Sequence, residues 1–256
     1  MSAHEFDPDA GCVDEVRQAA NFGDRVSGMP LDMIILHYTG MESGEAALDW
    51  LCNPESGVSC HYFVDEAGKI TQLVREESRA WHAGKSCWKG EDDINSRSIG
   101  IEIVNPGHEF GYRDFPESQI NAVMKLCLDC GNRLHIPPQN VLAHSDVAPT
   151  RKEDPGERFP WDRLYRAGIG HWVEPENVAS GRYLQRGDTG EPVEALQSML
   201  ALYGYVIDIT GQYDELTLAC VTAFQRHFRQ QKVDGVADYS TLATLHKLLG
   251  SLPESP

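Results

Sequence analysis

The chain has 256 residues, 41% of them hydrophobic and 24% charged, which is ordinary for a globular protein with a sizeable core. Its 22 Lys and Arg stand against 39 Asp and Glu, a formal net charge of −17. A groove for phosphate backbones needs the opposite charge, so this composition argues against a nucleic-acid partner.

The N-terminal residues lack the features of an export signal. Residues 1–14 are acidic and contain no Lys or Arg, whereas a secretory signal has a basic start followed by an apolar stretch. The sequence has no run of about 18 apolar residues, so it predicts no membrane-spanning helix. From the sequence as given we expect a cytoplasmic location.

Strand and helix patterns alternate through the first two thirds of the chain. After a polar start that we expect to be irregular through residue 30, the apolar run 31–38 predicts a buried strand. The later segments are a helix at 43–51 with Ser43 as its N-cap, a hairpin of 61–64 and 69–74, a strand at 98–105, a helix at 116–134 and a strand at 141–144. This alternation predicts an α/β (α+β) fold with a central mixed β-sheet flanked by helices.

The seven cysteines do not predict a disulfide framework, because their number is odd and their positions are scattered. Cys127 and Cys130 form a CxxC pair, which is also found in redox and metal sites. In the helix predicted over 116–134, however, both fall on the apolar stripe with Ile120 and Val123. We therefore interpret them as core residues.

The last part of the chain has the pattern of three short amphipathic helices. Apolar stripes recur between residues 193 and 249 and are separated by glycines, with Asp214 and Asp238 as candidate caps. The preceding stretch contains Pro, Glu and Gly without periodicity, which is typical of a linker. We predict a catalytic domain over 1–172, a linker over 173–182 and a small three-helix domain over 183–256.

Two histidines and one aspartate form a candidate metal site. His37 and His144 each end a short apolar strand, where open sheets place their ligands, and Asp154 follows in a polar, Pro-containing loop. Either histidine alone would suit a hydrogen-bonded structural role as well. Two imidazoles and one carboxylate match a catalytic zinc set that leaves one position for water, and they suit hydrolysis better than electron transfer.

Glu102 and Lys152 are the candidate catalytic residues. Glu102 interrupts a strand of Ile, Gly and Val, and a carboxylate in a covered strand is costly unless it is paired or used. A solvated strand face is the alternative. If Glu102 faces the metal, it can accept a proton from the attacking water. Lys152, two residues before Asp154, can stabilise the oxyanion of the attacked carbonyl, although an exposed loop lysine is the simpler interpretation.

Residues 31–161 resemble the zinc N-acetylmuramoyl-L-alanine amidases of the AmpD and AmiD type. The segments that carry the resemblance are 35–39, 58–62, 80–84, 98–106, 143–149 and 152–161. Six segments in this order are specific, although any one of them alone would not be. The resemblance implies that His37, His144 and Asp154 bind Zn2+, that Glu102 is the catalytic glutamate and that Lys152 stabilises the transition state.

The same resemblance implies the reaction. It is hydrolysis of the amide bond between N-acetylmuramic acid and L-alanine, with peptidoglycan or anhydro-muropeptide as substrate, in wall remodelling or recycling. Phage-type relatives carry a tyrosine where this chain has Cys60, so the role of that tyrosine is not transferred. We expect His61 to be structural or to contact a ligand residue, and Trp81 and His82 to line the substrate groove or to pack.

Residues 184–238 resemble the three-helix peptidoglycan-binding domain that is often attached to wall hydrolases. This implies a wall partner and gives the periplasm or cell envelope as the alternative location. Two other functions stay open from the sequence. One is a non-catalytic peptidoglycan-binding receptor, which the intact ligand set disfavours, and the other is a zinc peptidase that cuts within the stem peptide.

Overall fold

The computed structural model describes residues 6–177, 181 and 183–252. Its main sheet has six strands in the order β1, β5, β4, β7, β3, β8, and a two-stranded ribbon pairs β2 with β6. The strands are β1 (Glu15–Val16), β2 (Phe22–Asp24), β3 (Met33–Tyr38), β4 (Tyr62–Val64), β5 (Ile70–Gln72), β6 (Ser78–Ala80), β7 (Ser98–Ile103) and β8 (Val141–Ala143).

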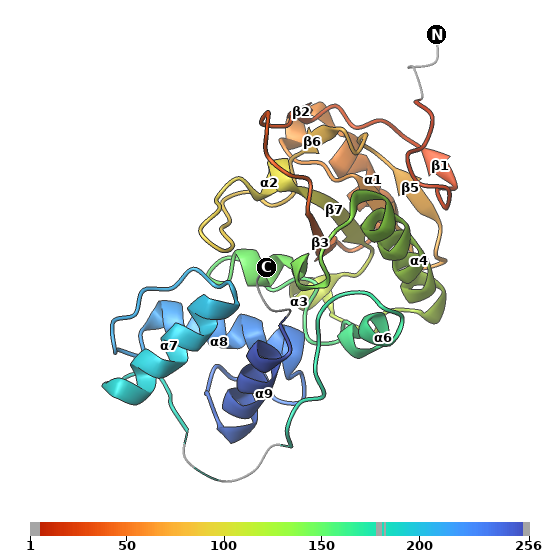
Figure 1. The fold of residues 1–256 in the computed structure, drawn as a ribbon. Helices are drawn as coiled ribbons and strands as arrows, with labels where there is room; N and C mark the ends of the chain where they lie inside the picture. Colours follow the sequence, from red (N-terminus) through yellow and green to blue (C-terminus); the bar gives the residue numbers. More distant parts are fainter. Residues whose placement is uncertain (1–5, 178–180, 182, 253–256) are drawn as a thin grey trace.

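The α-helices fall into two groups along the chain. Those of the sheet-containing part are α1 (Gly44–Cys52), α2 (Ile94–Arg97), α3 (Gly107–Phe110), α4 (Glu117–Leu134), α5 (His144–Val147) and α6 (Trp161–Arg166), with 3-10 turns at Pro54–Ser56 and Pro138–Asn140. The C-terminal part contains α7 (Glu191–Tyr203), α8 (Glu215–Phe228) and α9 (Tyr239–Gly250). In Figure 1 these three helices form a separate group below the sheet.

The main sheet is mixed, as predicted. β3 runs parallel to both β7 and β8, β7 also pairs in parallel with β4, and β4 and β5 form the predicted antiparallel hairpin. The central strands β3 and β7 are buried almost throughout, which explains the apolar run of β3 and the three isoleucines of β7. The fold class predicted from the sequence is confirmed.

The two faces of β7 have different partners. Ile99, Ile101 and Ile103 belong to the main core, together with apolar residues of α4. Val104 instead packs with Ala47 of α1 on the opposite side. The alternation of side chains along the strand therefore places Glu102 on the α1 side of the sheet.

Several local predictions are confirmed, but the prediction of an irregular start is wrong. The Ser43 side chain caps α1, and Asp214 and Asp238 cap α8 and α9. All seven cysteines are free, and Cys127 and Cys130 lie in the core. The segment up to residue 30 is not irregular throughout, because it contains β1 and β2. Short edge strands such as these depend on pairing with distant segments and leave little periodicity in the sequence.

One hydrophobic core extends through the sheet-containing part and the C-terminal helices. The Trp88 side chain is fully buried against Tyr203 and Tyr205, with ring centroids 6.0 and 5.1 Å away. Beside it the Lys89 amide donates to the Gly204 carbonyl at 2.9 Å. The predicted division at 173–182 stays a prediction, and residues 178–180 and 182 of that linker lie outside the described residues, as do 253–256 of the C-terminal domain.

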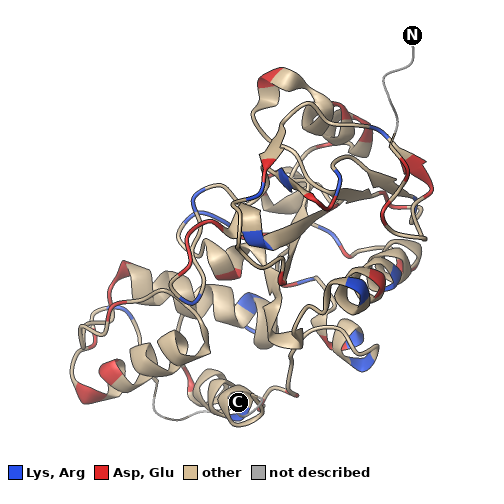
Figure 2. Cartoon of the chain, turned by 45° about the horizontal axis from the view of Figure 1, so that its top comes forward, with Lys and Arg blue, Asp and Glu red and all other residues tan. Residues whose placement is uncertain are grey.

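The surface carries the acidic excess on both parts of the molecule. Figure 2 shows Asp and Glu spread over helices and loops of both parts, interspersed with Lys and Arg. Within the described ranges, none of the helices has the length and apolar character needed to cross a bilayer.

Candidate active site

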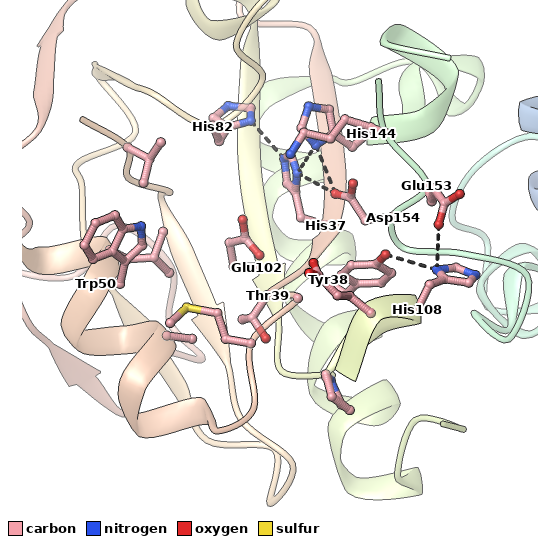
Figure 3. Close-up of a pocket in the computed structure, with 18 of the residues that line it drawn as sticks. His37, Tyr38, Thr39, Trp50, His82, Glu102, His108, His144, Glu153 and Asp154 are labelled. Atoms are coloured by element: carbon pink, nitrogen blue, oxygen red, sulfur yellow. Dashed lines mark hydrogen bonds and ion pairs between the residues drawn. The ribbon is translucent and has the colours of Figure 1, made fainter. Parts of the chain in front are cut away.

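A pocket of about 540 Å³ opens at the carboxyl ends of β3 and β7 (Figure 3). Strand pairing decides which side chains meet there, because His37 lies directly beside Glu102 in the parallel register. His144 and Asp154 arrive from the segments after β8. Residues on the walls include Tyr38, Thr39, Trp50, Trp81, His82, His108, Arg151, Lys152 and Glu153.

His37, His144 and Asp154 converge on one point at the back of this pocket. Nδ1 of His37 lies 2.9 Å from Nδ1 of His144, and Oδ2 of Asp154 lies 3.1 and 3.0 Å from those two nitrogens. All three side chains are buried, and their candidate ligand atoms lie within 4.8 Å of one another. The sequence predicts His144 at the end of a strand, and this is wrong because His144 is the first residue of the helical turn α5.

The tautomer of His144 follows from its outer hydrogen bond. Its Nε2 lies 3.0 Å from the Ala83 carbonyl oxygen, which can only accept. Nε2 therefore carries the proton, and the Nδ1 lone pair faces His37 and Asp154.

The tautomer of His37 is fixed by a chain of hydrogen bonds through His82. The Ser98 hydroxyl donates to the Ile94 carbonyl at 2.6 Å and accepts from His82 Nε2 at 3.1 Å. His82 Nδ1 is then the acceptor for His37 Nε2 at 3.0 Å, which leaves the Nδ1 lone pair of His37 facing inward. Burial lowers the pKa of His37 to about 4 and that of His82 well below its usual value, so both rings are neutral near pH 7.

Three electron-pair donors thus face one another with no hydrogen between them. Such a cluster is costly on its own and favourable around a cation, and two imidazoles with one carboxylate are typical zinc ligands. Outer hydrogen bonds that orient the ligating histidines are also typical of metal sites. The residues present therefore fit a metal ion.

His82 is the site residue whose role the sequence did not resolve. Its ring lies over Gly100 in β7, where an added Cβ would come within 2.3 Å of His82 Cγ. The glycine thus makes room for the ring that orients His37. Trp81, predicted to line the groove or to pack, does line the pocket.

Glu102 is half-buried in the wall of the pocket, and Figure 3 shows its carboxyl group directed toward the cluster. Its Oε2 has no hydrogen-bond partner within the described part of the chain. Burial, together with the charge of Asp154, raises the pKa of Glu102 well above its usual value. An unpartnered carboxyl group with a raised pKa is suited to accepting a proton. Lys152 lines the same pocket.

Most of the chain matches protein families that are already known. Residues 27–157 match the family model described as N-acetylmuramoyl-L-alanine amidase, and residues 189–245 match that of a putative peptidoglycan binding domain. The chain is 38% identical over 235 residues to the N-acetylmuramoyl-L-alanine amidase AmiD of Escherichia coli (strain K12), covering 86% of this chain and 82% of that one. This chain belongs to the N-acetylmuramoyl-L-alanine amidase family.

Two solved structures support the assignment. One is the E. coli amidase AmiD in complex with the substrate anhydro-N-acetylmuramic acid-L-Ala-D-gamma-Glu-L-Lys, with a TM-score of 0.75, 34% identity and coverage of 93% of this chain and 94% of that one. The other is AmpDh3 from Pseudomonas aeruginosa in complex with anhydromuramic pentapeptide, with a TM-score of 0.69, 32% identity and coverage of 90% and 93%. The family and the amidase activity predicted from the sequence are confirmed.

His61 has a structural environment in this amidase. Its Nδ1 accepts from the Gly100 amide at 2.9 Å, and its Nε2 lies 3.1 Å from the Ser78 carbonyl oxygen. Burial, and then the charge of Arg25, lower its pKa to about 3. This agrees with the structural role expected from the sequence.

The amidase should lose stability in mild acid because of such histidines. The unfolded chain binds a proton at His61 near pH 6.5, but the folded chain binds it only near pH 3. The free energy of unfolding should therefore fall as the pH drops through this window, by up to about 1.4 kcal/mol per pH unit for this group. The free energy of unfolding of metal-free protein can be measured with urea at about pH 7, 6 and 5. It should fall less steeply with decreasing pH in His61→Gln than in wild type. The same dependence of this free energy on pH in both proteins would contradict the lowered pKa of His61.

Proposed function

We propose that this amidase is a zinc enzyme in which His37, His144 and Asp154 hold the metal, Glu102 is the base and Lys152 stabilises the oxyanion. The observation that carries the proposal is the convergence of two imidazole lone pairs and a carboxylate beside the unpartnered carboxyl group of Glu102. When bound, zinc would supply the Lewis acidity that activates water and polarises the amide carbonyl.

The chain's own residues then handle the protons and the charge. Glu102 accepts a proton from the attacking water as the new bond between oxygen and carbonyl carbon forms. It returns that proton to the L-alanine nitrogen as the carbon–nitrogen bond breaks, which gives a lactyl carboxylate and a free peptide amine. Lys152 offers its ammonium group to the oxygen that becomes negative in between.

The proposed substrates are muropeptides with an N-acetylmuramic acid to L-alanine link, either soluble anhydro forms or strands of the wall. The AmiD and AmpDh3 complexes contain anhydro-muropeptides, which supports the first class. The match of residues 189–245 to a putative peptidoglycan binding domain supports the second.

A product assay tests this proposal. Purified full-length protein should release intact stem peptides that begin with L-alanine from both substrates, as identified by mass spectrometry. EDTA should abolish release, and added zinc should restore it. Shorter peptides would instead indicate a stem peptidase, and binding of wall material without turnover would indicate a receptor.

The compartment stays a prediction. The cytoplasm and the periplasm or cell envelope both stay open, and the match of residues 189–245 to a putative peptidoglycan binding domain supports the second. Fractionation of cells that express the gene from its native start codon distinguishes the two locations.

A further inference from the structure

The C-terminal helices contact the turn that presents His144. Asp146, two residues further along α5, is completely buried, and its carboxylate accepts three hydrogen bonds. The Ala143 amide donates from within the turn at 2.8 Å. The other two donors are His227 Nδ1 in α8 at 2.7 Å and the Tyr205 hydroxyl after α7 at 2.6 Å. Two of the three donors therefore come from the C-terminal part.

These contacts hold Asp146 in one orientation. The His227 ring stacks between Trp161 and Phe228, with centroids 3.7 Å from each. Burial and the neighbouring Asp146 raise the pKa of the Tyr205 phenol well above its usual value, so the hydroxyl stays a donor. Because an unpaired buried carboxylate is costly, removal of either donor should shift Asp146 and with it the turn.

The same helix also holds the segment that presents Asp154. Arg226 in α8 donates to Glu153, the residue before Asp154, at 2.9 Å. Gln230, which follows the end of α8, donates to the Phe159 carbonyl at 2.7 Å, further along that segment. The two ligand segments are themselves joined by a bond of 3.0 Å from the Ser145 amide to the Asp154 carbonyl.

We propose that the C-terminal helices are a positioning part of the metal centre, in addition to any contact with the wall. Tyr205 and His227 fix the turn that presents His144 by holding Asp146. Arg226 fixes the neighbouring segment that presents Asp154. This inference rests on the metal-binding role proposed above for His144 and Asp154.

Changes in these C-terminal contacts should affect metal binding and turnover but not substrate binding. Among the described residues, the walls of the active-site pocket include none from the C-terminal helices. A loosened ligand turn should therefore weaken zinc binding and lower kcat, while KM for a small soluble muropeptide stays close to the wild-type value.

Tyr205→Phe is the first test, with Tyr203→Phe as its matched control. Both phenols are buried beside Trp88, but the Tyr203 hydroxyl contacts His171 at 3.1 Å and not Asp146. In the full-length protein, chelator competition should show about tenfold weaker zinc binding for Tyr205→Phe, with a similar loss in kcat. Tyr203→Phe should match wild type in both.

A second pair of variants separates positioning from folding. His227→Phe keeps the stacked ring but removes the donor, whereas His227→Asn keeps an amide donor near the place of Nδ1. Zinc affinity should fall in the Phe variant and recover largely in the Asn variant. Circular dichroism should show both variants folded at the assay temperature.

Equal zinc affinity and kcat in Tyr205→Phe, Tyr203→Phe and wild type would overturn the positioning role. So would a loss in His227→Phe that His227→Asn does not recover. If wild type itself bound no zinc, the proposed function would fail and this inference with it. If wild type binds zinc and the variants bind it with equal affinity, only the inference fails.

Discussion

Glu102→Gln should lower kcat by roughly 10²–10⁴-fold, because the variant cannot accept the proton of the attacking water. The amide has nearly the shape of the carboxyl group, and the residue is not one of the three converging ligands, so zinc content should not change. The measurement is single-turnover cleavage of a soluble muropeptide, with zinc determined by elemental analysis of the same sample.

Glu77→Gln is the matched control for this change. Its side chain is exposed and pairs with Arg75 at 3.6 Å, away from the pocket, so activity should equal that of wild type. Full activity in Glu102→Gln would refute the proposed mechanism. A simultaneous loss of zinc would instead show that the carboxyl group helps to hold the metal.

Asp154→Asn should abolish turnover through loss of the metal itself. The change removes the anionic member of the ligand set and puts an uncharged amide opposite two imidazole lone pairs. Because a catalytic zinc site of this kind has three protein ligands, we expect zinc affinity to fall by at least about 100-fold. Chelator competition measures this, and excess zinc should restore little activity.

An exposed aspartate serves as the control for this loss. Asp114 pairs with Arg158 on the surface, and Asp114→Asn should keep both zinc and activity. If Asp154→Asn bound zinc as tightly as wild type, the ligand assignment would be wrong. The two main variants also differ from each other, since Glu102→Gln should retain zinc and Asp154→Asn should not.

The residues of the candidate site differ in how far neighbouring residues reveal them. Local patterns make His37 and Asp154 candidates, because an apolar strand that ends in histidine and a polar loop that ends in Asp-Pro-Gly can be recognised from a few residues. Glu102 is a candidate because a carboxylate is unusual in an isoleucine strand. These signals are short-range, and the structure brings the three residues together.

The role of His82 could not be read in the same way. Its part depends on Ser98 on one side and His37 on the other, residues that lie 16 and 45 positions away. A histidine has two nitrogens, and only its partners decide which one carries the proton. Gly100 gives no independent signal, because the space it leaves is occupied by a ring from another segment.

By itself, the sequence determined the fold class, the candidate ligands and the three C-terminal helices, because periodicity, caps and motifs are properties of neighbouring residues. The tertiary structure alone decided the strand register that sets His37 beside Glu102, and the hydrogen bonds that turn both Nδ1 lone pairs inward. It also decided that α8 lies against the ligand-bearing turn. These contacts join residues distant along the chain, and burial is what makes them specific, since a buried polar group must find its partner.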